Sequence, residues 1–213
     1  MINREVRIID SVNSLKAKFD FVARDIVDKR MRGYAPIISR KVGELIGDAL
    51  IRTPEAQSIL TGQLKADFGL TDTQASLSLE QLIEAVKRST TVKLNIKPTG
   101  GVRYAYAMVV SILPAGLSSV LSTIGAYKSN GNDIAWMEWL LTRGVEVVVD
   151  DAFIINGNKP NSRSGMAIMA QSAGSGRVFR VDSKYAGTAD DNFVTKTIGS
   201  LLPEIALIMR GYL

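Results

Sequence analysis

The side chains that most often carry enzymatic chemistry are absent from this sequence. Its 213 residues include neither a cysteine nor a histidine. This excludes thiolate nucleophiles, disulfides, zinc sites of the Cys/His type and every mechanism that uses imidazole as a general base. Carboxylates, Lys, Ser, Thr and Tyr remain. The chain has no Walker A sequence, no dinucleotide-binding glycine motif, no nucleophile elbow and no calcium-loop spacing.

Two adjacent carboxylate pairs, Asp150-Asp151 and Asp190-Asp191, are the remaining candidates for acid–base or metal chemistry. Neighbouring side chains on a strand point to opposite faces, so each pair would need partners from elsewhere. A turn at a strand end explains the first pair, and helix capping explains the second. We therefore predict no catalytic residue, no metal site and no cofactor, and we expect that the protein is not an enzyme. A histidine-free enzyme that uses carboxylates stays open as an alternative.

The positive charge is unevenly distributed along the chain. There are 26 basic and 21 acidic residues, a net charge of +5, and residues 1–52 account for +4 of it. In that region the two signs are interspersed, which is typical of a solvated helix face. A second basic cluster consists of Lys159, Arg163, Arg177, Arg180 and Lys184. Within it, Arg163, Arg177, Arg180 and Lys184 are candidates for contact with DNA phosphates or with a neighbouring subunit.

A short apolar segment, residues 134–142, contains two tryptophans three residues apart, Trp136 and Trp139. Side chains at this spacing share one face of a helix. Packing in the core is one interpretation. A subunit interface is the other, because aromatic residues and Met are enriched at interfaces.

The N-terminal region has the clearest helical period. Apolar residues recur at steps of four and three, at Ile8, Val12, Leu15, Phe19, Val22 and Ile26. This spacing predicts an amphipathic helix with a packed apolar stripe, and it is too short to require a coiled coil. Gly33 is expected to end this helix, and a second helix is expected from about Pro36 to residue 51.

Two further helix starts follow. Thr53-Pro54-Glu55 combines a capping hydroxyl, a proline and an acid, and predicts a helix that continues to Gly69. Ser78 and Gln81 form a capping-box pattern for a helix that ends near residue 88. Residues 1–90 are therefore predicted to be helical.

The period then changes to two. Residues 91–97 alternate between apolar and polar side chains and predict a half-buried strand, and residues 104–112 predict a strand buried on both faces. Asp133 is expected to cap a short helix that covers both tryptophans and stops at Gly144.

Later strands are expected at residues 145–149 and, continuing the same strand, 152–155. Asn156-Gly157 predicts a hairpin turn. Residues 166–170 and 177–181 flank Gly174-Ser175-Gly176 and predict a second, long hairpin.

The last part of the chain is predicted to be helical again. Thr188 is expected to cap it, with Asp190 and Asp191 in the first turn, and Pro203 is expected to divide it. The predicted fold class is α+β: an N-terminal helical region, a mostly antiparallel sheet with an embedded short helix and a long hairpin, and C-terminal helices. Residues 1–90 and 91–213 are the two regions, expected to form one folding unit.

The longest apolar stretch, residues 104–126, raises the question of a membrane span. It contains Pro114, two glycines and several hydroxyl side chains. Two buried elements joined near Pro114 explain it better than a lipid-facing helix does. The N-terminus has charges where a signal peptide would have an apolar core, so neither export nor membrane insertion is expected.

Several stretches resemble known phage proteins. Residues 60–68, Leu-Thr-Gly-Gln-Leu-Lys-Ala-Asp-Phe, resemble the T-G-x-L-[KR]-x-S-F segment of tail-completion and head–tail joining proteins of tailed bacteriophages, with Asp67 where the pattern usually has Ser. Residues 136–141, 162–169, 177–178 and 186–193 resemble phrases found in phage virion proteins of unassigned role. In the head–tail family the T-G-x-L segment closes an N-terminal helical region and precedes an antiparallel sheet.

The resemblance implies a structural protein of the virion, assembled in the host cytoplasm. It would form a homo-oligomeric ring, six- or twelve-fold, in the neck between head and tail, as a tail-completion, collar or tail-terminator protein. Its partners would be other neck, portal-adaptor and tail proteins, and DNA passing without sequence preference. On this interpretation the hairpin between Met166 and Val181 is an arm that reaches a neighbour.

A nucleic-acid-binding module without enzymatic activity is the alternative. A sequence pI of about 9.5 favours it. The sequence offers neither a compact basic helix nor an aromatic stacking motif in its support.

Overall fold

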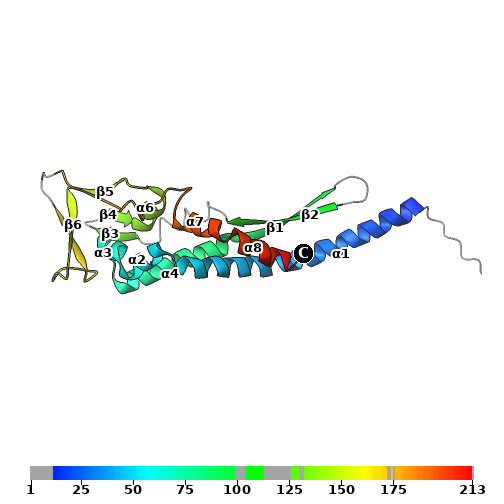
Figure 1. The fold of residues 1–213 in the computed structure, drawn as a ribbon, viewed down its shortest axis with the longest axis horizontal. Helices are drawn as coiled ribbons and strands as arrows, with labels where there is room; N and C mark the ends of the chain where they lie inside the picture. Colours follow the sequence, from blue (N-terminus) through cyan, green and yellow to red (C-terminus); the bar gives the residue numbers. More distant parts are fainter. Residues whose placement is uncertain are drawn as a thin grey trace, which may run out of the picture.

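The computed structural model describes residues 12–98, 104–112, 126–129, 132–171, 174 and 176–212. The molecule is elongated along its first helix, and the shorter helices and strands lie beside that helix (Figure 1). The helices in these ranges are α1 (Val12–Ile51), α2 (Pro54–Thr61), α3 (Gln63–Asp67), α4 (Asp72–Ser89), α6 (Trp136–Thr142), α7 (Phe193–Ser200) and α8 (Leu202–Arg210). None of them is both long enough and apolar enough to cross a membrane.

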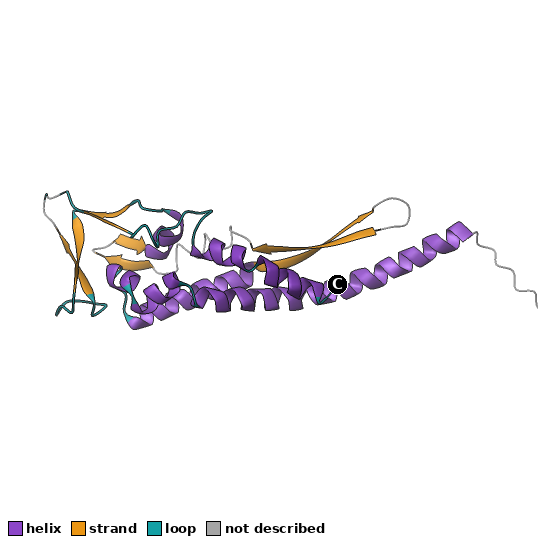
Figure 2. Cartoon of the chain, viewed as in Figure 1, coloured by secondary structure: helices purple, strands orange, loops and turns teal. Residues whose placement is uncertain are grey.

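The strands form antiparallel pairs between the helices (Figure 2). They are β1 (Thr90–Pro98) with β2 (Tyr104–Ile112), β3 (Ala126–Ser129) with β4 (Asn132–Ala135), β5 (Val147–Asp150) with β8 (Val178–Arg180), and β6 (Ala152–Asn156) with β7 (Ala167–Gln171). The predicted α+β class and the order of helices, strands and helices are confirmed. The described strands make four two-stranded ladders and not one continuous sheet.

Helix α1 continues through the predicted break. Gly33 and Pro36 both lie inside it, so the expectation of two separate helices was wrong. A glycine costs a helix only about 1 kcal/mol, and burial of Met31, Ile38 and Val42 on one side of α1 favours continuity. Pro36 has no N–H to donate to the carbonyl of Arg32, and sharp bends in helices are almost always found at such positions. The helix changes direction between its two halves (Figure 1).

The core lies along the second half of α1. Ile38, Val42, Ile46 and Leu50 are fully buried at helical spacing, and α4 packs against them. Helices α7 and α8 also contact α1. At the end of α8, the ring of Tyr212 lies 5.1 Å from that of Tyr34 and ties the C-terminus to α1.

The helices after α1 start and stop at recognisable residues. The Oγ of Thr53 accepts from the N–H of Ala56, as predicted, but the helix breaks at Gly62 and α3 continues to a stop at Gly69, which has φ +59°. The predicted capping box at Ser78 was wrong, because Ser78 is buried inside α4. The box is at Thr71, whose Oγ accepts from the N–H of Gln74 while Thr71 N–H donates to the Gln74 side chain.

Both strands that were predicted between residues 91 and 112 are present, and they form the first hairpin. Strand β1 pairs with β2 in register from Thr90 opposite Ile112 to Pro98 opposite Tyr104. Val109 is exposed, so β2 is not buried on both faces throughout. Asp133 does not cap α6, because it lies in β4 opposite Lys128. The predicted junction near Pro114 lies outside the described residues.

The second group of strands pairs differently from the prediction. Asp151, with φ +49°, separates β5 from β6, which therefore do not form one strand. The hairpin after Asn156 exists, but a loop of residues 157–166 closes it in place of a two-residue turn. The hairpin expected around Gly174 was wrong, because β7 pairs with β6 and β8 pairs with β5. Residues 166–181 are therefore not a single hairpin arm.

The C-terminal helices divide near Pro203, as predicted. Their start differs: Asn192 caps α7, and Thr188 instead accepts from the N–H of Asp191. The reason is local, since α7 begins at Phe193 and Asn192, directly before it, accepts from the N–H groups of Val194 and Thr195, which Thr188 lies too early to reach.

Candidate functional site

The most exposed apolar surface lies on residues 12–30 of α1, which we call the arm. The arm projects beyond the other elements (Figure 1). Phe19 is 73% exposed, Val22 53% and Ile26 59%. These are the residues that were predicted to form a packed stripe, so within the described part of the chain the stripe exists but nothing covers it. Ile8 lies outside the described residues, and the side chains of Val12 and Leu15 are not described.

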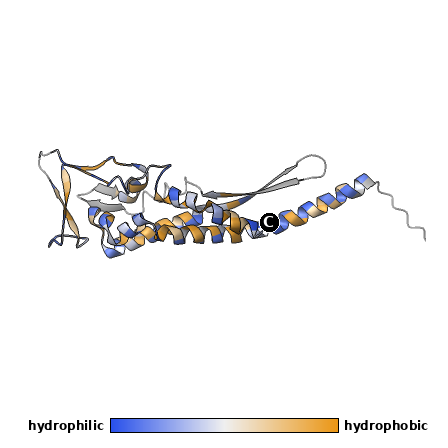
Figure 3. Ribbon diagram, viewed as in Figure 1, coloured by the Kyte–Doolittle hydropathy of each residue, from blue (hydrophilic) through white to orange (hydrophobic). Residues whose placement is uncertain are grey.

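Alternating apolar and polar residues along the arm are visible in Figure 3. Its cations and anions are paired locally: Lys29 lies 2.9 Å from Asp25, and Arg32, just beyond the arm, lies 2.7 Å from Asp28. Such exposed pairs contribute little to stability, so they can be exchanged for other partners. The arm is thus an apolar face bordered by exchangeable charges.

The segment that resembles the phage motif, residues 60–68, covers the end of α2 and all of α3 and leads to α4. Ser58 Oγ accepts from the N–H of Leu64 at 3.0 Å, and Leu64 is fully buried. Phe68 packs its ring 5.2 Å from Trp136 and 5.9 Å from Phe179. The segment therefore joins the helical region to α6 and β8.

Two charged side chains of this segment are buried, Lys65 and Asp67. The ammonium of Lys65 pairs with Asp72 at the start of α4. Burial raises the pKa of Asp67 to about 6, although a hydrogen bond from Gln63 favours its charged form. Asp182 raises this pKa further and Lys184 lowers it. Asp67 is thus the one described group with a pKa brought near neutrality, and its environment disfavours the charge.

A polar contact connects this junction to the C-terminal half of the chain. Lys184 Nζ donates to Gln63 Oε1 at 2.7 Å and lies 3.5 Å from Asp182. The backbone N–H of Lys184 also donates to Asp182, which lowers the pKa of that carboxyl. Lys184, a predicted site residue, is therefore used within the chain to hold residues 182–184 against α3.

Arg163 also contacts the helical region, through Gln74 of α4. Its guanidinium lies 3.4 Å from the side-chain oxygen of Gln74. Arg163 also lines an open surface hollow with Asp67, Gly69, Asn161 and Met169. The guanidinium of Arg163 and the partly buried carboxyl of Asp67 thus line the same hollow, and the described part of the lining contains no Ser, Thr, Lys or Tyr side chain.

Arg180 is the last residue of β8 and Arg177 lies directly before this strand, apart from these contacts. Arg180 Nη1 donates to the carbonyl of Val145 at 2.8 Å, and the guanidinium of Arg177 lies 4.9 Å from the ring centre of Phe153. Both residues are exposed. Arg163 and Lys184 thus contact glutamines of the helical region, Gln74 and Gln63. Arg177 and Arg180 instead contact Phe153 and Val145.

The two tryptophans have different surroundings. Trp136 is 1% exposed and packs on Phe68, so it belongs to the core and leaves no surface for a neighbouring subunit. Trp139 is half-buried, with the Arg143 guanidinium 5.7 Å from its ring centre. Of the two, only Trp139 has surface to offer to a partner.

The carboxylate pairs have structural surroundings. Asp151 holds the turn between β5 and β6, and Asp191 lies 3.4 Å from Lys196. Across the described ranges, no three acidic residues gather in a way that could hold a metal ion. Neither pair is joined by a third carboxyl there.

Several interacting residues were missed from the sequence. Gln63 and Asp182 carry contacts of the junction, and no local pattern marks them. Gln74 could have been found, because it is the third residue after Thr71 in a capping-box pattern. Asn192 could have been found, since it stands three residues before Thr195 and forms a capping box with it.

Comparison with known proteins gives no match: no protein-family model, no curated protein and no solved structure matches this chain.

Proposed function

We propose that this protein is a virion structural protein of the phage head–tail neck, which acts by assembling into a ring and not by chemistry. The observation that carries the proposal is the uncovered apolar stripe of the arm. Single exposed apolar residues are normal on a protein surface, but several exposed apolar residues on one stripe mark an interaction site. A stripe at the end of a long projecting helix is suited to contact another subunit.

The motif segment, residues 60–68, adds to the proposal the resemblance itself. In the structure α4 lies between this segment and the first hairpin, so the segment lies within the helical region and does not close it. Leu64 to Phe68 are buried, and the ring of Phe68 packs against Trp136 and Phe179.

Two basic residues at β8 give the proposed ring a way to let DNA pass. Arg177, directly before this strand, and Arg180, at its end, are exposed, and such residues contact phosphates without reading bases. We assign them as candidates for the lining of the channel. The other candidates, Arg163 and Lys184, are engaged with Gln74 and Gln63 and suit a structural role.

The proposal is tested by electron microscopy and native mass measurement of the purified protein. We expect closed rings of six or twelve copies with a central opening. Filaments without closure, or binding of the isolated protein to duplex DNA with an affinity that falls steeply as salt rises, would contradict the neck proposal. The DNA-binding result would favour a nucleic-acid-binding module instead.

For the channel residues, we expect Arg177→Glu and Arg180→Glu together to leave ring formation intact and to reduce retention of the genome in assembled particles. Unchanged retention would remove these residues from the channel. The matched control is Arg52→Glu, at an exposed arginine in the turn directly after α1 and outside the basic cluster.

A further inference from the structure

The ring of Tyr212 contacts α1 on both sides of Pro36. Its centre lies 5.1 Å from that of the Tyr34 ring, before the proline, and 5.2 Å from the ammonium of Lys41, after it. Tyr34 and Lys41 are seven residues apart, so they lie on the same face of the helix, almost two turns from each other. A single side chain thus spans the position at which the carbonyl of Arg32 lacks a helical N–H donor.

Pro36 lies on the opposite side of α1 from this contact. At about 100° per residue, it is about 200° around the helix axis from Tyr34. The missing hydrogen bond lets the helix open on the side of the proline, and a helix that opens there bends toward the side of Tyr212. Figure 1 shows α1 changing direction toward the side on which α8 lies. Tyr212 is therefore on the inside of this change of direction.

An open hollow lies beside the contact, between the C-terminal end of the arm and the residues that follow α8. It is lined by Val27, Arg30, Met31, Tyr34, Gly211 and Tyr212. The hollow leaves space into which the arm can move if the rings separate. Tyr34 is itself held in place, because Arg30 Nε donates to its hydroxyl at 3.1 Å. A change of helix angle at Pro36 would therefore alter the contact between the rings of Tyr34 and Tyr212.

We propose that Tyr212 is a brace that fixes the angle between the two halves of α1 and, with it, the direction of the arm. Its ring is a positioning group: it packs against the Tyr34 ring before the proline and holds the Lys41 ammonium over its face after the proline. Displacement of Gly211 and Tyr212 from α1 frees the arm to change direction. The inference concerns the single chain and does not depend on the proposed ring.

The test measures distances between two spin labels in the full-length protein. The chain contains no cysteine, so Lys16→Cys on the arm and Arg88→Cys on α4, both at exposed positions, give two unique attachment sites. Labelled protein is diluted into an excess of unlabelled protein of the same variant, so that the measured distances lie within one copy. With Tyr212 present, we expect a single narrow distance distribution.

Removal of the ring is expected to release the arm. Lys16 is 20 residues from Pro36, about 30 Å along the helix, so each ten degrees of added freedom displaces the label by about 5 Å. We expect Tyr212→Ala to broaden the distribution and Tyr212→Phe, which keeps the ring, to leave it narrow. The matched control is Tyr185→Ala, which removes another half-buried ring with a lysine ammonium 4.7 Å from its centre, and it should leave the distribution narrow.

A double variant separates a brace from general stabilisation. Pro36→Ala restores the N–H that bonds the carbonyl of Arg32 and stiffens α1, so Tyr212→Ala in this background is expected to leave the distribution narrow. Lys41→Met keeps both rings and the aliphatic stem, and is expected to show part of the broadening.

Two results would overturn the inference. One is an equally narrow distribution for the wild type, Tyr212→Ala and Lys41→Met. The other is broadening by Tyr212→Ala that persists in full in the Pro36→Ala background, because the ring would then act elsewhere than across the proline. Neither result bears on whether the protein forms rings, which microscopy of the wild type decides.

Discussion

Asp67 is a buried carboxyl at the position where the resembling phage segment has Ser. Its pKa of about 6 lies above the ordinary value near 3.8, and burial is the main cause. A raised carboxyl pKa means that the folded chain binds more protons than the unfolded chain between these two values. The free energy of unfolding therefore falls as the pH rises from 4 through 6.

Replacement of this residue gives a clear pH signature. We expect Asp67→Ser to be more stable than the wild type at pH 8, with an advantage on the order of 1 kcal/mol larger than at pH 4. Urea unfolding at both pH values measures this. Asp190→Ser, at an exposed position, is the control and should show no such change. An advantage independent of pH would mean that the charge of Asp67 is not the cause.

Gly62 is required by close packing. A Cβ at this position would lie 2.8 Å from the Cα of Ser58, so the backbone between α2 and α3 would have to move. We expect Gly62→Ala to lower the free energy of unfolding by roughly 1–3 kcal/mol. Gly33→Ala is the opposite case: no atom lies within 4 Å of its added Cβ, and it should stabilise α1 by roughly 0.5–1 kcal/mol. Equal effects in chemical denaturation would contradict this packing argument.

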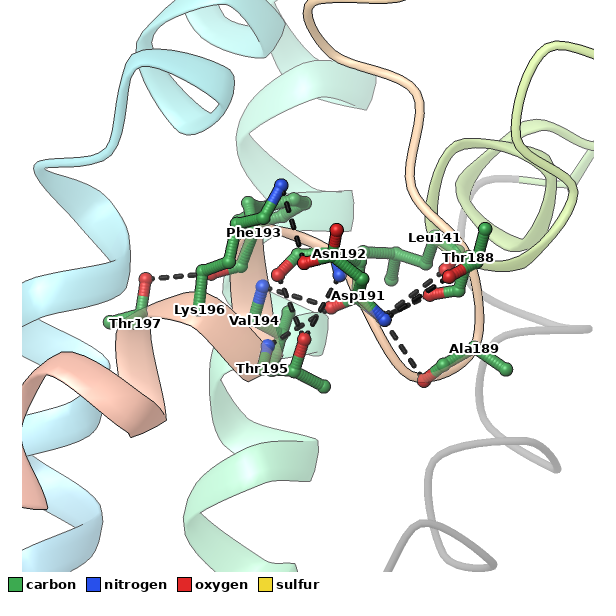
Figure 4. Close-up of polar contacts among 10 residues, drawn as sticks. All are labelled: Leu141, Thr188, Ala189, Asp191, Asn192, Phe193, Val194, Thr195, Lys196 and Thr197. Carbon is green, nitrogen blue, oxygen red and sulfur yellow. Dashed lines mark hydrogen bonds and ion pairs between the residues drawn. The ribbon is translucent and has the colours of Figure 1, made fainter.

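Among the elements, α7 depends on one residue for both its start and its attachment. The Oδ1 of Asn192 accepts from the N–H groups of Val194 and Thr195, and its Nδ2 donates to the carbonyls of Leu141 and Thr188 (Figure 4). The same side chain thus caps α7 and holds it to the end of α6. No other described cap joins two elements that are so distant in sequence.

Loss of this cap should exceed the cost of an ordinary one. We expect Asn192→Ala to destabilise the protein by about 2 kcal/mol or more, because it also leaves a buried carbonyl without its donor. Asn192→Asp should restore the cap but not the bonds to the carbonyls, and should recover part of the loss. Thermal unfolding of both variants measures this, and equal melting temperatures for the two would limit the role of Asn192 to the carbonyl bonds.

Local sequence patterns predicted where helices and strands lie better than they predicted which strands pair and which side chains meet. The alternation at residues 91–97, the Thr53 cap and the division at Pro203 were right because each depends on neighbours in sequence. The pairing of β7 and β8 was wrong because two glycines suggested a turn, while the partners are chosen by packing of distant strands. For the site, the spacing of apolar residues predicted the stripe on the arm, but it did not predict that Phe19, Val22 and Ile26 are exposed. The contact of Lys184 with Gln63, 121 residues away, has no local pattern.

For the whole molecule, the two halves of α1 should differ in stability. The apolar residues Phe19, Val22 and Ile26 of the arm are exposed, whereas Ile38, Val42, Ile46 and Leu50 are fully buried in the core. Isolated helices of this length are marginal in water. We expect amide hydrogens of residues 16–28 to exchange much faster than those of residues 38–50 in dilute solution, and to become protected as concentration rises. Protection of the arm at every concentration would mean that it is packed within the monomer.

Pro36 lies far from the N-terminal end of α1, so a small change of helix angle there has a large effect at that end. Val12 is 24 residues from Pro36, about 36 Å at 1.5 Å per residue, so a change of five degrees at Pro36 would move the end of the arm by about 3 Å. In a closed ring every subunit must turn by the same angle relative to the last. Straightening α1 with Pro36→Ala would therefore be expected to alter the diameter and copy number of the assembly more than the stability of the subunit.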